Sequence, residues 1–349
     1  MQKSDGATHR GIYLLDAWYM AAWSETVDAA LKPITLLDTP VVLFRTSDGE
    51  VRALLDECPH RFAPLSSGKL DGDTVVCGYH GLRFAGSGEC VDPRFTEINR
   101  TRACVRSFPV IERDAMIWIW MGDADRVDPA GIPDFSFFSD PGRSSFFGYT
   151  HVKANYQLET DNLMDLSHLD YVHVGTIGAG ATLQGKHSVV QEGRTVHSCW
   201  TCNGIECPPQ LVPFLQPGDA KVDHWMDMRW DAPALLRLDT GATLAGKPRQ
   251  DGFFSLQAHF ATPETEHTTH YFWGLSVPGP ANAMHDVVNA AVRQAFEEED
   301  RPMIESVQQR MGTNEFWAKQ PLILAEDAGA IRARRLLDQL IQAECRATE

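Results

Sequence analysis

The sequence predicts an α+β fold in which a small all-β domain, residues 1–122, precedes a mixed domain, residues 123–349. Short apolar runs bounded by turn signals fill the first part, and longer segments with helical periodicity are found in the second. A length of 349 residues is sufficient for two domains of this kind.

Strands are expected throughout residues 33–56 of the first domain. The apolar runs Val41–Phe44 and Val51–Leu55 flank Asp48-Gly49, a common two-residue hairpin turn. Met116–Trp120 is a further apolar strand, closed by a glycine and an aspartate. These short strands indicate a small β-barrel or sandwich with loops at its ends.

The second domain is expected to begin with a connector, residues 123–141, because this stretch is rich in Pro, Gly and Asp. Strands are predicted within residues 224–277, with Thr262-Pro263-Glu264 as the turn between two of them. Helices are predicted over residues 156–173, 284–310 and 326–345.

Composition excludes several classes of partner. A formal net charge of −16 argues against nucleic acid, which requires basic patches. No apolar run approaches the ~20 residues that span a bilayer, and the N-terminus lacks the hydrophobic core of a signal peptide. The expectation is a soluble, cytoplasmic protein.

Its eight cysteines, including Cys199, Cys202 and Cys207, are then expected to be mostly reduced thiols rather than a disulfide framework.

Two short motifs in the first domain each combine a cysteine with a histidine. Cys58 and His60 form a C-x-H motif, and Cys77 and His80 form a C-x-x-H motif. This set suits a [2Fe–2S] cluster with cysteines on one iron and histidines on the other, which has a raised reduction potential. Zinc sites more often pair Cys with Cys and His with His, so a structural zinc protein is the weaker interpretation.

A second candidate metal site lies in the helix predicted over residues 156–173. Asp161, Asp165 and His168 occur at i, i+4 and i+7, which places them on one helical face. His173 is about 140° further around an ideal helix, so both histidines can bind one ion only if the helix is irregular there. Two imidazoles and one carboxylate form the facial triad of non-haem Fe(II) oxygenases.

Asp300 is the predicted third ligand of this iron. The helix expected over residues 284–310 has an apolar stripe, and Asp300 falls on it, where an unpaired carboxylate would be costly to bury. Glu299 lies at the edge of the stripe and is the alternative ligand. The stripe consists of Val292, Phe296, Met303 and Val307.

These motifs resemble those of Rieske non-haem iron oxygenase α-subunits, in the group of vanillate and dicamba O-demethylases and toluenesulfonate methyl-monooxygenase. The likeness covers most of residues 15–340 and is poorest over residues 174–222. Besides the cluster motifs, it is carried by Val105–Arg113, Ile117–Trp120, Asp161–His168, Tyr171–His173 and Thr262–Thr265.

The resemblance implies a Rieske domain followed by a helix-grip catalytic domain, assembled as a homotrimer. It further implies that an electron passes from His80 to the iron of a neighbouring subunit through Asp165. The position of Asp165, three residues before His168, also suits a carboxylate that orients the His168 ring. Asn162, one turn earlier, is either a supporting polar group of this site or an ordinary polar helix residue.

The implied reaction is a monooxygenation that uses O2 and electrons from NADH or NADPH. The chain has no G-x-G-x-x-G dinucleotide motif, so a separate flavin/iron–sulfur reductase is expected to supply the electrons. Hydroxylation of a methoxy group would give a phenol and formaldehyde, and hydroxylation of an aryl methyl group would give a benzylic alcohol. The resemblance implies an aromatic acid as substrate.

Substrate contacts are predicted less directly. His259 alternates with Leu256, Ala258 and Phe260, so it faces the other side of its strand, where it could contact substrate. Arg237 is a second candidate, and residues 174–222 are expected to shape the pocket.

Two further functions are compatible with the sequence. A ring-hydroxylating dioxygenase α-subunit would have the same fold and a small β partner. A Rieske electron carrier would bind the cluster and no mononuclear iron, but the D-x2-H-x4-H motif argues against it.

Overall fold

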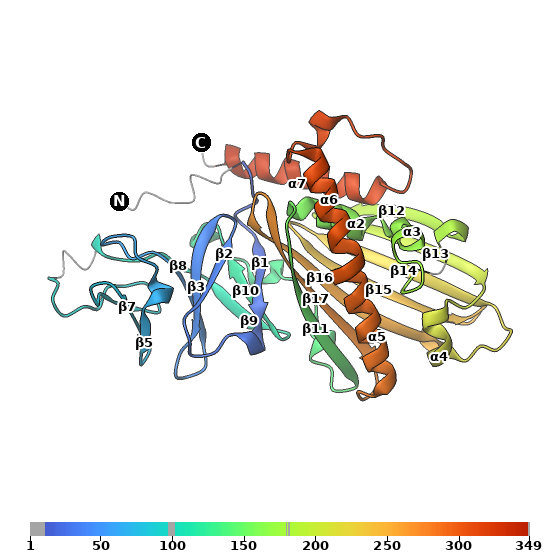
Figure 1. The fold of residues 1–349 in the computed structure, drawn as a ribbon, viewed down its shortest axis with the longest axis horizontal. Helices are drawn as coiled ribbons and strands as arrows, with labels where there is room; N and C mark the ends of the chain where they lie inside the picture. Colours follow the sequence, from blue (N-terminus) through green and yellow to red (C-terminus); the bar gives the residue numbers. More distant parts are fainter. Residues whose placement is uncertain (1–10, 97–101, 179, 181, 348–349) are drawn as a thin grey trace. The chain divides into compact units, whose positions relative to one another are not determined.

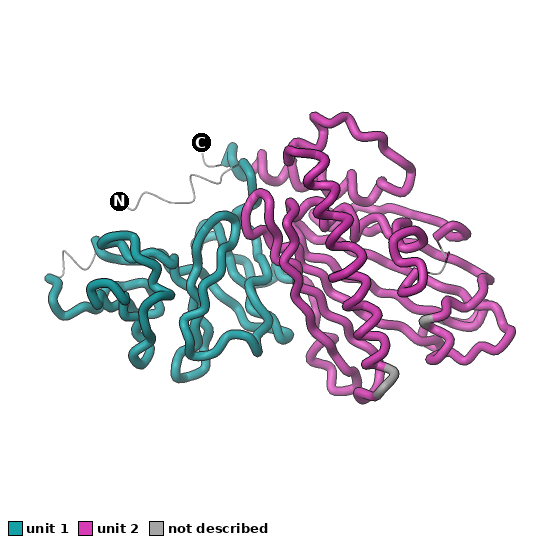
Figure 2. Tube along the Cα trace, viewed as in Figure 1, with its two compact units in different colours: residues 1–132, 344–349 teal, residues 133–343 magenta. Residues whose placement is uncertain are grey.

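The computed structural model describes residues 11–96, 102–178, 180 and 182–347, and it divides the chain into two compact units. Unit 1 comprises residues 1–132 and 344–349, and unit 2 comprises residues 133–343 (Figure 2). The division falls inside the segment 123–141, which forms short 3-10 turns. Each unit has its own sheets, so the predicted α+β organisation is confirmed.

Unit 1 is built from three small antiparallel sheets, with strand orders β1-β10-β9, β2-β3-β4-β8 and β5-β6-β7. The predicted hairpin is present: β3 pairs with β4, and Gly49 in the turn has a φ of +90°. The strands are β1 (Trp18–Trp23), β2 (Lys32–Leu36), β3 (Thr39–Arg45), β4 (Val51–Leu55), β5 (Lys69–Asp71), β6 (Thr74–Val76), β7 (Arg83–Ala85), β8 (Ser107–Phe108), β9 (Val110–Arg113) and β10 (Met116–Trp120).

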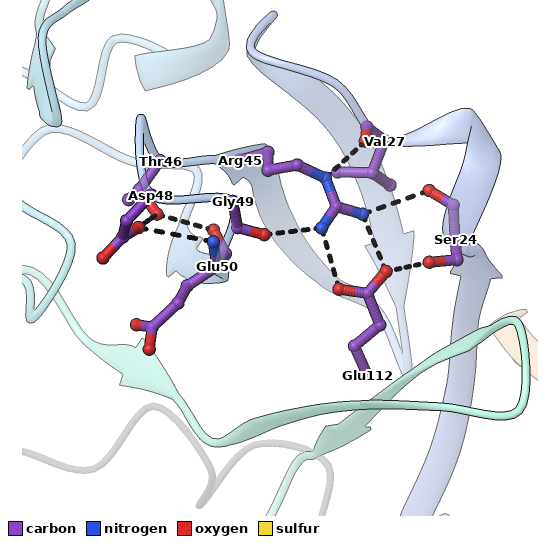
Figure 3. A network of polar contacts seen from close by, with 8 residues as sticks. All are labelled: Ser24, Val27, Arg45, Thr46, Asp48, Gly49, Glu50 and Glu112. Carbon is purple, nitrogen blue, oxygen red and sulfur yellow. Dashed lines mark hydrogen bonds and ion pairs between the residues drawn. The ribbon is translucent and has the colours of Figure 1, made fainter.

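A polar network joins two of these sheets (Figure 3). Arg45 at the end of β3 contacts both carboxylate oxygens of Glu112 on β9, at 2.8 and 2.9 Å. The same guanidinium donates to the carbonyls of Gly49 and Val27, and Ser24 donates to Glu112. Because bidentate pairing fixes the guanidinium plane, this contact sets the position of the β3–β4 hairpin relative to β9.

Unit 2 is a seven-stranded antiparallel sheet of order β11-β17-β16-β15-β14-β13-β12, with helices against one face (Figure 1). Strands β11 to β13 lie outside the segments in which the sequence predicted strands. The strands are β11 (Arg143–Val152), β12 (Lys186–Glu192), β13 (Thr195–Ile205), β14 (Val222–Asp231), β15 (Leu235–Leu244), β16 (Phe253–Thr265) and β17 (Thr268–Pro278).

The predicted turn at Thr262–Glu264 is wrong. Strand β16 continues to Thr265, and the chain reverses at residues 266 and 267 before β17 begins. Pro263 is accommodated because the pairing of β16 with β17 is irregular between Pro263 and Thr265. A proline lacks the N–H that a regular ladder needs, so it is tolerated where the ladder is interrupted.

The predicted helices are confirmed, with two irregularities that the sequence did not locate. The helix expected over 156–173 is interrupted at Asp165, and the helix expected over 284–310 contains a π-helical segment, Ala295–Asp300. The helices are α2 (Tyr156–Met164), α3 (Leu169–Val172), α4 (Val212–Leu215), α5 (Ala283–Gln294), α6 (Arg301–Met311) and α7 (Ala328–Arg346).

The π segment changes which residues of α6 are buried. Val292 and Phe296 of the predicted apolar stripe are buried, but Met303 and Val307 are 52% and 41% exposed. Ile304 is buried instead. A π turn holds an extra residue, so every later position is rotated around the helix axis and the buried face moves by one residue.

Candidate functional site

The two cysteine–histidine motifs of unit 1 form loops of the same backbone geometry. The amide of Cys58 donates to the carbonyl of Ala63, and the amide of Cys77 donates to that of Leu82. Four residues after each cysteine the backbone is left-handed, with φ of +59° at Phe62 and +71° at Gly81. The cysteine therefore has the same place in each loop, and the histidine follows it by two residues in the first loop and by three in the second.

The side chains of these loops divide into a buried pair and an exposed pair. Cys58 and Cys77 are buried, whereas His60 and His80 are exposed with ring centroids 4.5 Å apart. Burial raises the pKa of the Cys58 thiol to about 11. Iron would supply the positive charge that a buried thiolate needs, so the donor set fits a [2Fe–2S] cluster with histidines on the outer iron.

The predicted iron ligands of unit 2 meet at one point. Ligand atoms of His168, His173 and Asp300 all lie within 4.8 Å of one another. His173 and Asp300 are buried, and His168 is half-buried. Two imidazoles and one carboxylate at this spacing suit Fe(II) with open positions on the other side.

The segment that carries both histidines is not a regular α-helix. Asp165 has φ −117° and ψ 87°, after which Leu166–His168 form a 3-10 turn and Leu169–Val172 an α turn. His173 ends this turn with a non-helical φ of −102° and ψ of 30°, so the backbone also departs from an α-helix at the second histidine.

Hydrogen bonds fix the tautomer of each histidine. His168 Nδ1 donates to the Asp165 carbonyl at 2.6 Å, and His173 Nδ1 donates to Glu299 at 2.7 Å. Both Nε2 atoms face Asp300 Oδ1, at 3.5 and 3.1 Å. The buried Nε2 of His173 has no hydrogen-bond partner of suitable geometry in the described residues, as expected for an atom that binds metal.

The carboxylates around the three residues favour a positive charge at this point. Burial alone would lower the pKa of His173, but Asp300 and Glu299 outweigh it and raise that pKa. Burial lowers the pKa of His168, with Asp300 opposing it. The unpaired negative charge of these carboxylates is what a divalent ion would neutralise.

Asn162 and Glu299 support the ligands without joining them. The Asn162 amide donates to Asp300 Oδ1 at 3.2 Å. Glu299, the alternative ligand in the sequence, instead accepts from His173 and from the Thr176 hydroxyl at 2.7 Å. Such partners orient ligands and tune their basicity.

The Asp165 carboxylate does not hold the His168 ring, which differs from the expectation. It accepts from the Ser167 amide at 3.0 Å, and the Asp165 main-chain carbonyl contacts the ring instead.

Asp161 lies further back on α2 and forms a bidentate pair with Arg334 of α7 at 2.6 to 2.8 Å. Asp161 therefore anchors α2 and takes no part in the metal site.

A cavity of about 350 Å³ lies beside the three ligands, between the sheet and the helices. Its sheet wall follows from strand register. Met228 pairs with Leu238, Leu238 with Gln257, and Gln257 with Leu275, and all four side chains line the cavity. Residues two apart on each strand share this face, which is the period of a strand.

Of the two predicted substrate contacts, one lines the cavity and one does not. His259 is buried in the cavity wall, where Nδ1 lies 2.8 Å from the Tyr271 hydroxyl. Arg237 lies on the opposite face of β15, over the Phe137 ring. Residues 174–222 contribute to the lining as expected, through Thr176, Ile177, Thr182, Pro209, Leu211, Pro213 and Phe214.

Sequence reasoning missed His224, which also lines the cavity. Its Nδ1 donates to the Gly241 carbonyl at 2.8 Å. The signal was present in the alternation of His224, Met226 and Met228 along β14.

The three cysteines singled out in the second domain are free thiols. Burial raises the pKa of Cys199, Cys202 and Cys207, so these thiols remain protonated and are unreactive.

Replacing Glu299 by glutamine is expected to lower iron affinity at the three-ligand site by about 10–100-fold. Glutamine can still accept from His173 but carries no charge to raise the basicity of the imidazole. Iron retention against a chelator measures the effect, and the visible spectrum of the cluster should not change. Glu297, which pairs with Arg293 at 2.8 Å, gives the control variant Glu297→Gln. Equal iron retention by both variants would contradict the role of Glu299.

Comparison with known families matches both parts of the chain. Residues 17–109 match the Rieske [2Fe-2S] domain, and residues 152–343 match the vanillate O-demethylase oxygenase C-terminal domain. Among the described residues, no helix combines the length and apolar character needed to cross a bilayer.

Individual relatives are similar over nearly the whole chain. The dicamba O-demethylase oxygenase component of Stenotrophomonas maltophilia is 38% identical, over 95% of this chain and 99% of the relative. The iron–sulfur subunit of a toluene-4-sulfonate monooxygenase system of Comamonas testosteroni is 36% identical, over 95% and 98%. A crystal structure of dicamba monooxygenase with non-haem iron and dicamba superposes with a TM-score of 0.82 at 36% identity, over 96% and 99%.

Proposed function

Since this chain belongs to the oxygenase components of Rieske non-haem iron monooxygenases, we propose that it inserts oxygen into a methyl C–H bond of an aromatic compound. The observation that carries the proposal is the meeting of His168, His173 and Asp300 beside a cavity, in a chain that also has a Rieske domain. We assign Cys58, His60, Cys77 and His80 to the cluster and those three residues to the mononuclear iron.

Iron bound by these ligands would supply O2 activation next to the bound substrate. The described residues have three tasks around it. Glu299 and the Asp165 carbonyl hold the two imidazoles in the tautomer that presents Nε2. Asn162 orients Asp300. The apolar wall of Met228, Leu238 and its neighbours holds an aromatic ring beside the ligands and excludes water.

The overall reaction needs an external electron source. An aryl methyl ether, O2, two electrons and two protons give a phenol, formaldehyde and water. We propose that a flavin/iron–sulfur reductase supplies the electrons from NADH or NADPH. The eight cysteine thiols support a cytoplasmic, reducing location.

Electron delivery is proposed to cross a subunit boundary in a homotrimer. His60 and His80 are exposed on unit 1, which supports donation from a histidine edge to another subunit. Asp165 follows α2 directly and its carbonyl holds the His168 ring, which supports its role as the entry point to the iron.

A product screen tests the proposed reaction. The oxygenase, loaded with cluster and iron, is combined with a reductase and NADH and offered methoxy- and methyl-substituted aromatic compounds. We expect formaldehyde, or a benzylic alcohol from methylarenes, in proportion to NADH oxidised. A cis-diol product would favour the ring-dioxygenase alternative. Reduction of the cluster without any product would favour the electron carrier.

A further inference from the structure

The carbonyl of Met164 lies where α2 ends and the turn that carries the first proposed iron ligand begins. Met164 is the last residue of α2, and Asp165 after it has non-helical backbone angles. The last four carbonyls of a helix have no partner within the helix, and Met164 is fully buried, so its carbonyl needs a donor from another part of the fold. Ser198 of β13 supplies it: the Ser198 hydroxyl donates to this carbonyl at 2.9 Å.

Ser198 is in turn held by His187 of β12, the edge strand of the sheet. Nε2 of His187 lies 2.8 Å from the Ser198 hydroxyl oxygen. The single proton of that hydroxyl is given to Met164, so Ser198 accepts from His187. Burial lowers the pKa of His187, with Asp165 and Glu326 opposing it, so the ring is neutral at neutral pH and its one proton is on Nε2.

The sheet fixes the direction of both side chains. His187 pairs with Trp200 across the two strands and stacks on its indole, with ring centroids 4.7 Å apart and planes 13° apart. Ser198 precedes Trp200 by two residues and therefore shares its face of β13, so the imidazole reaches the hydroxyl along the diagonal between the strands. Because Ser198 is only 1% exposed, bulk water does not compete for this contact.

The first turn of α7 closes the contact from another side. A Cβ atom added to Gly329 would lie 2.8 Å from the Ser198 hydroxyl oxygen and 3.1 Å from the Met164 carbonyl oxygen. The absence of a side chain at Gly329 is what lets α7 approach both groups. Three elements, α2, β13 and α7, thus pack around one hydrogen bond, which leaves it little room to shift.

The next carbonyl along the chain connects this hydrogen bond to the metal site. The Asp165 carbonyl accepts from His168 Nδ1 at 2.6 Å. The carbonyls of Met164 and Asp165 belong to adjacent planar peptide groups, so the two backbone angles of Asp165 set their relative direction. Holding the Met164 carbonyl therefore restricts how the next carbonyl meets the His168 ring.

We infer that His187 and Ser198 are positioning residues of the iron site, which fix the bend at Asp165 and through it the orientation of the His168 ring. Both act through the Met164 carbonyl rather than on a ligand directly. The inference rests on the proposed function, because that function assigns His168 to iron. It also gives residues 174–222, which were expected to shape the pocket, a second task.

Affinity for Fe(II) tests the inference without turnover. The oxygenase, with its cluster intact and its mononuclear iron removed, is titrated anaerobically with Fe(II). Ser198→Ala and His187→Leu should each bind the ion about 10–100-fold more weakly, as is typical when a group that orients a ligand is lost. His187→Gln should stay within about threefold of the wild type, because its side-chain amide can still donate to Ser198. His197→Gln, one residue before Ser198 on the other face of β13, is the matched control.

A double variant distinguishes contacts in series from two unrelated effects. If His187 acts through Ser198, adding His187→Leu to Ser198→Ala should weaken Fe(II) binding no further. Wild-type affinity in Ser198→Ala overturns the inference, and so do losses that add in the double variant. Equal losses in His187→Gln and His187→Leu, with thermal unfolding midpoints lowered in parallel, also overturn it in favour of simple packing. A wild-type protein that binds no mononuclear iron would instead refute the proposed function, and the inference with it.

Discussion

Asp300→Asn is expected to remove the mononuclear iron and leave the cluster in place. Asp300 is buried, and its Oδ1 is the point toward which both histidine Nε2 atoms face. An amide oxygen is a weaker, uncharged ligand, so the site should lose iron affinity by more than the ~10–100-fold typical of supporting residues. Iron content should fall from about three to about two atoms per chain, and turnover should fall at least about 100-fold.

The neighbouring acidic residues provide the control for this experiment. Glu298 is exposed and lies only two positions from Asp300. Glu298→Gln removes one negative charge from the same helix and should leave iron content and turnover near wild-type values. Iron analysis, the spectrum of the reduced cluster and product formation together distinguish loss of a ligand from loss of charge or fold. Retention of three irons by Asp300→Asn would refute the assignment of Asp300.

The two candidate metal sites could be proposed from the sequence because each depends mainly on short-range spacing. A cysteine and a histidine within four residues, or two histidines within six, are placed by one loop or one turn, so spacing alone limits the geometry. Asp300 is distant in sequence, but it could be found because a carboxylate on an apolar helix stripe requires a partner. Strands such as Met116–Trp120 were equally evident, since a continuous apolar run bounded by glycine has few other interpretations.

Other features depend on backbone irregularity, which composition does not encode. The π segment Ala295–Asp300 moves the buried face of α6 from Met303 to Ile304, although the sequence pattern continues without a break. The break at Asp165 likewise has no proline or glycine to mark it. Both irregularities adjoin the proposed iron ligands, and irregular helix turns are common where distant side chains meet at a functional site.

The face of the sheet that lines the cavity could not be predicted from the sequence, for a different reason. Strand β14 alternates polar and apolar residues, so the sequence shows that it has two faces but not which face is covered by helices. Pairing across four strands, from Met228 to Leu275, decides that question, and register is a property of the whole sheet. The alternation of His224 with Met226 and Met228 marks one face of β14, but only the register places that face on the cavity, whereas the alternation around His259 predicted its side correctly.

Asp165→Asn and Asp165→Ala should both lower turnover at least about 100-fold if the Asp165 carboxylate carries electrons into the iron site. The structure gives this residue two separable tasks in its own subunit. Its main-chain carbonyl holds the His168 ring, and its carboxylate caps the 3-10 turn through the Ser167 amide. Asparagine preserves both contacts and removes only the charge, whereas alanine also removes the cap.

The pair of variants therefore separates bridging from capping. Iron content and the cluster spectrum should be unchanged in Asp165→Asn, and the pre-reduced cluster should be oxidised by O2 and substrate far more slowly than in the wild-type protein. If Asp165→Asn turns over normally while Asp165→Ala loses iron, the carboxylate acts only as a cap. The electron would then have to enter through the His168 ring by another route. Because asparagine keeps every contact that the subunit itself displays, a loss of electron transfer in that variant points to a partner beyond the subunit.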